Sequence, residues 1–391
     1  MPRLKAILLV VAVLGVAGFA AARFVRSAPG GTGGECRQFS GDDRQACYTR
    51  LLSDRLTNQG VADAVATLDA LAAADPDVAE HAHEYAHGIG IAAYGRSTDI
   101  VGTFGACGDG YSSGCRHGVI QAYFEARNHV AAPEIEALCQ PFKSAVASRW
   151  VLFQCVHGMG HGLTMYHGHD LPRALADCDL LSEGWDRESC YGGAFMENVI
   201  NATTPHHPAS QLAAQSHHHA AATTFKAIEP SDPLYPCSIM AQRYLHACYQ
   251  MQTSVMLHLN HGSIASAAKS CDRAPEHMRN VCHQSLGRDI TSYTARDPQK
   301  TADMCEKSSE PYRPACYFGA AKALVDWTAT TGAAFAFCRI VAKEAGGPTC
   351  YQALGEEIAT LVASAQERED QCARAEDPDA VAICRRGAGL R

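Results

Sequence analysis

The 391-residue chain has few aromatic residues, 7%, and no block of consecutive basic residues. Few aromatics disfavour a stacking surface for single strands, and a net charge of −8 gives no electrostatic footprint for nucleic acid. The chain also lacks a P-loop, a dinucleotide fingerprint, a GxSxG elbow and a CxxCH haem motif. Kinases, NAD enzymes, the usual serine esterases and c-type cytochromes are therefore poor hypotheses, and no nucleic-acid partner is expected.

Only one long apolar run is present, and it lies near the N-terminus. Arg3 and Lys5 precede the uncharged residues 6–22. A basic start followed by an apolar stretch is typical of an export signal. The length of the run favours a signal-anchor over residues 1–29, while Ala20-Ala21-Ala22 is a small-residue site that leaves cleavage open. We expect an extracytoplasmic protein, periplasmic or at the cell surface, tethered to the membrane by its N-terminal helix or secreted.

Cysteine and histidine are abundant, with 18 and 19 copies. An even number of cysteines in an exported chain is typical of disulfides. Consecutive cysteines fall into pairs, most of them 11 or 12 positions apart, and we expect each pair to form a local bridge. The pairs are Cys36/Cys47, Cys107/Cys115, Cys139/Cys155, Cys178/Cys190, Cys237/Cys248, Cys271/Cys282, Cys305/Cys316, Cys338/Cys350 and Cys372/Cys384.

The second cysteines of the last five pairs recur every 34 residues, from Cys248 to Cys384. A fixed period of about this length indicates stacked helical hairpins. Two cysteines 11 positions apart in one straight helix would be about 16 Å apart, which exceeds disulfide reach. Each pair must therefore fold back across a turn. The sequence predicts an all-α solenoid of helical hairpins, each with a disulfide that joins the end of its first helix to the start of its second.

Two units show how the hairpins are expected to form. In the unit of Cys350, residues 333–345 predict the first helix, and Gly346-Gly347-Pro348 separates it from a second helix that ends near Val362. Residues 60–95 predict a unit without cysteines, with helices over 61–74 and 78–94.

The repeats also divide the chain into regions. A tether and the Cys36/Cys47 unit occupy 30–59, His/Glu-rich repeats occupy 60–200, and disulfide-stapled repeats occupy 237–391. Between the repeats lies a histidine-rich insertion, 201–236, which contains His206, His207 and His217-His218-His219.

The architecture resembles the Sel1-like and TPR-like helical repeats, especially the cysteine-stapled kind found in secreted bacterial proteins. This resemblance rests on the period and the bridges, and the TPR signature residues are absent. It implies a stack of helical hairpins and no more; separately from the resemblance, a repeat platform can hold a protein or peptide partner on its concave face. The resemblance implies no catalytic activity.

Histidines occupy one register position in three adjacent units. His117 and His157 each lie two residues after the second cysteine of their pair, and His87 matches them in the cysteine-free unit, where Tyr85 takes the cysteine's place. Neighbouring second helices in such a stack lie about 8–10 Å apart, so side chains in the same register can converge on one pocket.

Helical neighbours enlarge this histidine group. His83 lies four residues before His87, and His161 lies four residues after His157, so each pair shares a helix face. Gln121, Glu125 and Glu197 lie on the same or nearby faces and can add ligands or acid/base groups. The expected metal ligands are His83, His87, His117, His157, His161 and Glu197.

Residues 83–87 read His-Glu-Tyr-Ala-His, an HExxH string that resembles the zincin metallopeptidases. The resemblance implies His83 and His87 as zinc ligands and Glu84 as general base. Glu125 is a second candidate for acid/base catalysis. Histidines with carboxylates predict a divalent metal, with zinc favoured over copper or iron.

Three functions remain open at this point. The leading hypothesis is a metal-dependent enzyme, most simply a hydrolase that uses a bound water. An extracytoplasmic scaffold that binds a protein or peptide without catalysis is the second, and a protein for metal sequestration or delivery is the third. A purely structural interpretation also stands, in which the histidines are core residues and the glycine after each one permits close helix packing.

Overall fold

The computed structural model describes residues 33–143, 148–203, 223–343 and 346–391. These residues form α-helices and short 3-10 helices, with no strand among them. The expected signal segment, 1–29, lies outside the described residues, as do His206, His207 and His217–His219 of the insertion. Within the described ranges, no helix has the length and apolar character needed to span a membrane.

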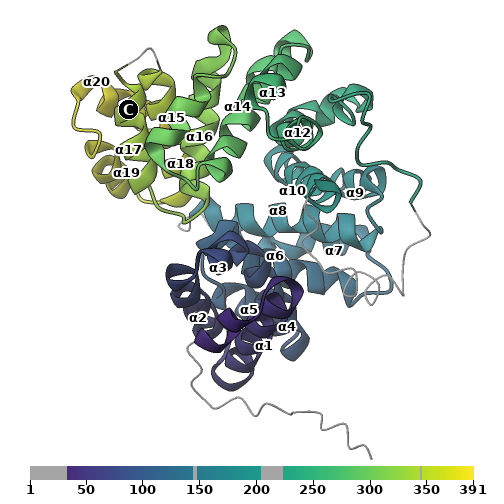
Figure 1. Cartoon of the computed structure of the whole chain (residues 1–391). Coiled ribbons are helices and arrows are strands. Elements are labelled where there is room, and N and C mark those ends of the chain that lie inside the picture. The colour runs from purple at the N-terminus through teal and green to yellow at the C-terminus, as the bar shows by residue number, and fades with distance from the viewer. Residues whose placement is uncertain (1–32, 144–147, 204–222, 344–345) are drawn as a thin grey trace, which may run out of the picture.

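The predicted helical hairpins are confirmed, because short first helices alternate with longer second helices along the chain (Figure 1). The first helices are α2 (Val61–Ala74), α5 (Ile100–Ala106), α7 (Ala132–Leu138), α9 (Leu171–Cys178), α13 (Ile264–Cys271), α15 (Pro298–Cys305), α17 (Gly332–Val341) and α19 (Ala365–Ala373). The second helices are α4 (Ala82–Arg96), α6 (Gly110–Glu125), α8 (Arg149–Tyr166), α10 (Gly184–Thr203), α12 (Leu245–Leu259), α14 (Glu276–Tyr293), α16 (Arg313–Asp326), α18 (Gly347–Leu361) and α20 (Pro378–Gly387).

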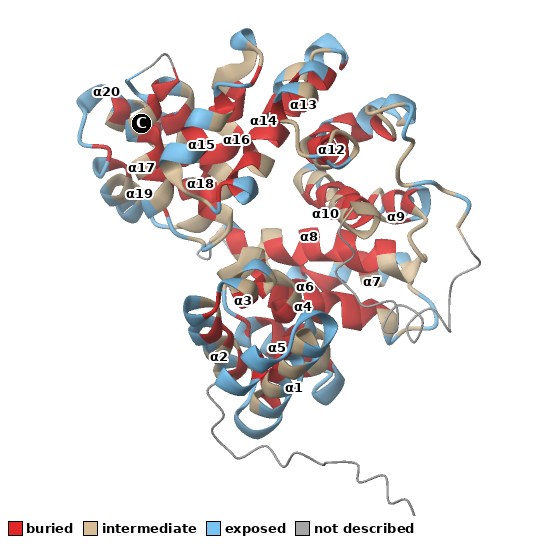
Figure 2. Cartoon of the chain, in the orientation of Figure 1, coloured by how far each residue is buried: buried red, intermediate tan, exposed pale blue. Residues whose placement is uncertain are grey.

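The second helices form a continuous layer, since each packs against the second helix of the next hairpin from α4 to α20. Buried residues are concentrated along these helices, and exposed residues lie mainly on the first helices and turns (Figure 2). At the N-terminal end, α1 (Gly41–Gln59) packs on α2 and α4. The remaining elements are α3 (Pro76–Glu80), η1 (Gly34–Gln38), η2 (Gln140–Phe142), η3 (Cys237–Ile239), η4 (Gln242–Tyr244) and η5 (Glu310–Tyr312).

All nine predicted cysteine pairs are disulfides, with Cα–Cα distances of 5.4 to 5.8 Å. The bridges join Cys36 to Cys47, Cys107 to Cys115, Cys139 to Cys155, Cys178 to Cys190, Cys237 to Cys248, Cys271 to Cys282, Cys305 to Cys316, Cys338 to Cys350, and Cys372 to Cys384. A bridge across a loop this short contributes about 3 kcal/mol in loop-entropy models. Each hairpin is thus stabilised locally.

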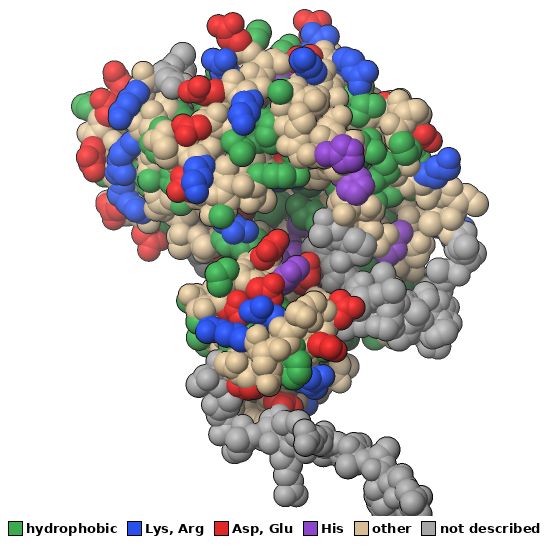
Figure 3. Space-filling view, viewed as in Figure 1, with side chains coloured by type: hydrophobic (Ala, Val, Ile, Leu, Met, Phe, Trp, Pro, Cys, Tyr) green, Lys and Arg blue, Asp and Glu red, His purple; other side chains and the backbone are tan. Residues whose placement is uncertain are grey.

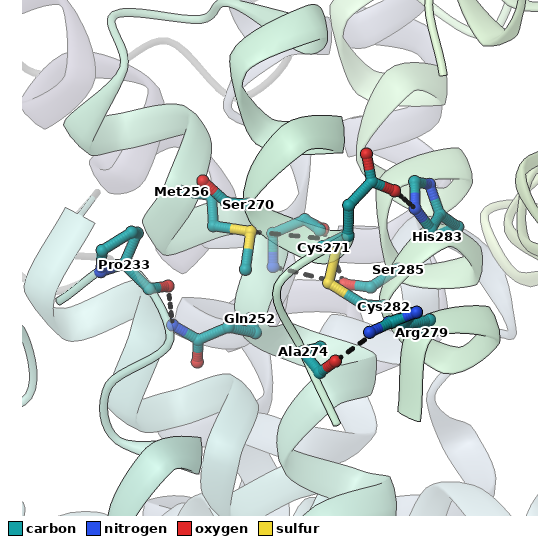
Figure 4. The surroundings of a disulfide bond; sticks show 12 residues. Pro233, Gln252, Met256, Ser270, Cys271, Ala274, Arg279, Cys282, His283 and Ser285 are labelled. Carbon is teal, nitrogen blue, oxygen red and sulfur yellow. Dashed lines mark hydrogen bonds and ion pairs between the residues drawn. A yellow bond between two sulfur atoms is a disulfide. The ribbon is translucent and has the colours of Figure 1, made fainter. Parts of the chain in front are cut away.

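The hairpin of α13 and α14 shows the surroundings of one bridge (Figure 4). The disulfide joins Cys271, the last residue of α13, to Cys282. The Arg279 guanidinium closes the same turn by donating to the Ala274 carbonyl at 3.1 Å. Covalent and hydrogen bonds therefore fix this turn together.

The expectation that each bridge reaches the start of a second helix is corrected, because the second cysteines lie farther along. Cys47 and Cys190 each lie six residues after the first residue of their helices, α1 and α10. Cys316 lies three residues after the first residue of α16. The other second cysteines are likewise inside their helices. The reason is geometric: the end of a first helix packs alongside its partner helix, so the residue within disulfide reach is about one to two turns from the start of that partner.

The first cysteines of two bridges also depart from the predicted pattern. Cys36 lies in the 3-10 helix η1, and Cys237 lies in the 3-10 helix η3, rather than at the end of a first α-helix. The described residues before Cys237, 223–236, are turns and irregular chain. A disulfide needs only a short Cα–Cα distance, so a tight 3-10 turn serves as well as a helix end.

Two expectations about helix limits are corrected. α17 ends at Val341 rather than at residue 345, because a turn begins there. The helix expected over 78–94 is two helices, α3 and α4, interrupted at His81.

The stack of hairpins curves back on itself, so that α18 packs against α8 (Figure 1). A second contact joins the start of α6 to the end of α16. There the Ser112 N–H donates to the Trp327 carbonyl at 3.3 Å, and the Tyr111 and Trp327 rings lie 5.9 Å apart. Figure 3 shows a hollow between the N-terminal and C-terminal halves, with histidine side chains visible at its lower edge.

Candidate metal centre

His83 and His87 on α4 and His117 on α6 form the centre of the histidine cluster. Each offers a ligand atom, and these three atoms lie within 4.8 Å of one another. The ring centroids are 4.5 Å apart for His83 and His87, and 5.7 Å apart for His87 and His117. The register argument expected His87, His117 and His157 at the centre and His83 at the edge, whereas the converging set is His83, His87 and His117. The five histidines predicted from sequence form one connected group of rings.

Close helix packing brings these rings together, and glycine permits it. A Cβ at Gly118 would lie 2.2 Å from the His87 carbonyl oxygen, and a Cβ at Gly90 would lie 1.9 Å from the Cys115 carbonyl oxygen. The backbones of α4 and α6 therefore touch beside His87 and His117. Close helix packing does not explain the glycine at position 88, because a Cβ added at Gly88 would meet open space.

Two buried glutamines orient two of the imidazoles. The His87 Nδ1 lies 3.0 Å from the Gln121 Oε1, and the His117 Nε2 lies 2.9 Å from the Gln154 Oε1. An amide oxygen only accepts, so these ring nitrogens carry the protons and donate them. The lone pairs are then on the His87 Nε2 and the His117 Nδ1. Such hydrogen bonds set the tautomer of metal-binding histidines.

The third imidazole is oriented by an unusual turn at the start of α6. The His83 Nδ1 donates to the Tyr111 carbonyl at 2.6 Å, and its lone pair is therefore on Nε2. Tyr111, Ser112 and Ser113 have φ angles of 55°, 50° and 57°, in the left-handed region. This conformation costs L-residues roughly 1–2 kcal/mol each. The turn points the Tyr111 carbonyl at His83 while Ser112 contacts the C-terminal half.

His161 is paired with Glu197 of α10. The His161 Nδ1 donates to the Glu197 Oε2 at 2.9 Å, and His169 lies 3.4 Å from the other carboxylate oxygen. Burial alone would raise the pKa of Glu197, but the hydrogen bonds from His161 and His169 hold that pKa well below its ordinary value. Glu197 is therefore a carboxylate, buried and engaged on both sides.

His157 lies at the periphery of the cluster. Its ring is 5.5 Å from His117 and 5.1 Å from His161, and it contacts Phe153 on its own helix at 5.2 Å. Burial, followed by the proximity of His161, lowers the pKa values of both His117 and His157 well below 6.5. These buried imidazoles are therefore neutral near neutral pH, the form that binds metals.

Two nitrogens of the cluster have no hydrogen-bond partner among the described residues. They are the His117 Nδ1 and the His161 Nε2, each on a fully buried side chain. Leaving a buried polar atom unpaired costs about 1–3 kcal/mol. A metal ion bound to the His117 Nδ1 would remove one such cost, because the lone pair of that nitrogen then has a partner. The residues present therefore fit a metal with nitrogen ligands.

The chain matches no protein-family model, no curated protein and no solved structure. The chemistry of the site is therefore the basis for a functional assignment.

The two predicted acid/base residues lie in different surroundings. The Glu84 carboxylate accepts from the Gln45 side chain at 3.3 Å and lies 3.4 Å from the His81 Nδ1, so its contacts are toward α1 and the start of α4. Burial raises the pKa of Glu84. Glu125 is two turns beyond His117 on α6, and burial together with the charge of Glu197 raises its pKa to about 7.

Three groups that position the cluster were missed from the sequence. Gln154 lies directly before Cys155 and outside the histidine register, and nothing in its spacing predicts a bond to His117. The Tyr111 carbonyl depends on left-handed residues that are not glycine. His169 follows α8 in a turn, where the helical period no longer applies.

Proposed function

We propose that this protein binds a divalent metal ion at His83, His87 and His117 and uses it in a hydrolytic reaction. The observation that carries the proposal is the set of three converging ligand atoms, on three rings that each also donate a hydrogen bond to an oxygen acceptor. Such outer hydrogen bonds are typical of metal-binding histidines.

The ligand set favours zinc over copper or iron. Zinc accepts imidazole nitrogens at about 2.0–2.1 Å, and catalytic zinc sites typically have three protein ligands and one open position. Three nitrogens bound to one ion would lie about 3.4 Å from one another, whereas the three ligand atoms here lie within 4.8 Å of one another. Small rotations of the side chains would bring all three to bonding distance. Cysteine ligation is ruled out for the described cysteines, since all of them are in disulfides.

The position of His83 supports access to the site from solvent. His83 is half-buried, whereas His87 and His117 are buried. The half-buried side of His83 is thus the side of the cluster that a substrate could approach. When bound, the metal would polarise a water molecule and the scissile carbonyl.

We further propose an exported protein, tethered to the membrane or secreted. Nine disulfides support an oxidising compartment, because such bridges persist mainly outside the cytosol. A relationship to cysteine-stapled Sel1-like or TPR-like repeats is also a proposal, supported by the hairpin stack alone.

The metal content of untagged protein tests the proposal. We expect about one zinc per chain after zinc refeeding and dialysis, and hydrolysis of at least one substrate in a broad ester and peptide panel. His87→Ala should lose both. His246→Ala is the matched control, because His246 is exposed on α12, where it pairs with Glu188. Wild type that holds no zinc after refeeding would contradict the proposal and would favour the peptide-binding scaffold.

A further inference from the structure

We infer that His161, held by Glu197, is the catalytic residue that accepts a proton from the attacking water. This inference rests on the proposed hydrolytic function. The zincin resemblance gives the role of general base to Glu84, and we assign it instead to the pair of His161 and Glu197. These two residues are then not metal ligands, although the sequence analysis includes them in the ligand set.

The hydrogen bonding of His161 prepares it for this role. Its side chain is 0% exposed, and the carboxylate that it faces can only accept. The proton of the ring is therefore on Nδ1, and the lone pair is on Nε2. That Nε2 has no hydrogen-bond partner among the described residues. A buried imidazole with one nitrogen on a carboxylate and a lone pair on the other is the arrangement of a histidine general base.

The location of His161 places its ring beside the metal centre. Glu197, on α10, holds one nitrogen of the ring, while rings on α6 and α4 lie close to it. The ring stacks on His117 at 5.1 Å and lies 6.2 Å from His87. His161 is nevertheless not among the three residues whose ligand atoms converge within 4.8 Å. It is thus next to the three ligands without being one of the converging set.

Glu84 is less suited to the same role. Its carboxylate is engaged by Gln45 and His81 on the side of α1. Glu197 instead fixes the orientation of the His161 ring, because its carboxylate accepts the Nδ1–H at 2.9 Å.

The proposed step balances as an ordinary acyl hydrolysis. The water oxygen forms a bond to the acyl carbon while one of its protons passes to the His161 Nε2. The bond from that carbon to the leaving nitrogen or oxygen then breaks, and His161 returns the proton to the leaving group. Glu197 remains ionised throughout, and no oxidant or other co-reactant is needed.

Cobalt(II) substitution separates a base from a ligand. In cobalt-loaded protein, the visible absorption reports the ligands of the metal, independently of activity. We expect His161→Ala and Glu197→Gln to keep one cobalt per chain and the band positions of wild type, whereas His87→Ala should lose them. Hydrolysis of p-nitrophenyl acetate by the zinc forms of both variants should fall about 10²–10⁴-fold, the usual contribution of a general base. Added imidazole should restore part of the activity of His161→Ala but not that of His87→Ala.

Each other outcome has a definite meaning. Altered cobalt bands in His161→Ala would make His161 a ligand and overturn the inference, with the proposed metal centre intact. Unchanged bands with unchanged hydrolysis would overturn it as well. Wild type without cobalt bands, or with bound metal and no hydrolysis of any ester or peptide, would overturn the proposed function and this inference together. Melting curves of the metal-free variants confirm that each is folded before the comparison is made.

Discussion

Gly118 on α6 lies directly against the carbonyl of His87 on α4, and a Cβ at position 118 would be 2.2 Å from that oxygen. The closeness of these two backbones sets the spacing of the His87 and His117 rings. Backbone atoms cannot rotate away as a side chain can, so any larger residue here must move one helix relative to the other. The glycine after His117 therefore serves both packing and the site.

Gly118→Ala should consequently lower both stability and metal affinity. We expect a loss of stability of about 1–3 kcal/mol from overpacking, together with weaker zinc binding as His117 shifts. Gly88→Ala is the matched control, because its Cβ would meet open space and alanine is preferred over glycine in a helix by about 1 kcal/mol. Chemical denaturation and zinc titration of both variants make the comparison. Equal effects of the two changes would contradict the packing argument.

Gln154 should matter through the tautomer of His117. In Gln154→Leu, the buried His117 Nε2 loses its acceptor, so the proton is free to move to Nδ1, the nitrogen expected to bind the metal. Loss of such an outer hydrogen bond typically costs 10–100-fold in metal affinity. Competition with a chromophoric chelator measures this change. Gln366→Leu on the exposed surface of α19 is the control, and it should bind zinc like wild type. An unchanged affinity in Gln154→Leu would argue against His117 as a ligand.

Glu125 predicts a pH-dependent difference in stability. Its folded pKa of about 7 exceeds the ordinary value of 4.5, so the folded state holds this proton more tightly than the unfolded state does. Stability is therefore lost as the pH rises from about 4.5 through 7. Glu125→Gln removes this loss, and the metal-free variant should gain relative to wild type by up to about 1.4 kcal/mol per pH unit across that window.

Chemical denaturation of wild type and Glu125→Gln at pH 4.5, 6 and 8 measures this pH-dependent difference in stability. The exposed Glu310→Gln serves as control and should show no such trend. A difference between Glu125→Gln and wild type that is the same at all three pH values would show that the Glu125 carboxyl is not destabilised by burial and Glu197.

Features that repeat in the sequence were predictable, and features made by long-range contacts were not. The cysteine period predicts the hairpins and all nine bridges, and the shared register of His87 and His117 predicts that their rings lie close together, because both follow from helical geometry within and between adjacent units. His157 shares that register but lies at the periphery of the cluster. The closure of the stack at Trp327 depends on the summed rotation of many hairpins, which no local pattern encodes. The end of α17 at Val341 was missed because residues 342–345 favour helix by composition.

The exact position of a cysteine within its hairpin also could not be predicted from the sequence. The pairing of Cys305 with Cys316 follows from their spacing, but how far Cys316 lies inside α16 depends on where the turn ends and how the two helices overlap. The same uncertainty applies to Cys47 in α1 and to Cys190 in α10.

The roles of individual side chains were the hardest to predict. A sequence motif places Glu84 beside two histidines, but its direction depends on α1, which is remote in sequence and supplies Gln45. In the same way, the spacing of His161 is equally suitable for a ligand and for a base. Only the separation of His161 from the converging atoms distinguishes these roles.

X-ray absorption at the zinc edge tests the central claim most directly, since it counts the imidazoles around the metal in the full protein. We predict three histidine nitrogens at about 2.0 Å and one further oxygen, with no sulfur. The His161→Ala spectrum should be the same, and the His117→Ala spectrum should show one imidazole fewer. A wild-type spectrum with oxygen neighbours and no imidazole would contradict a metal centre at His83, His87 and His117.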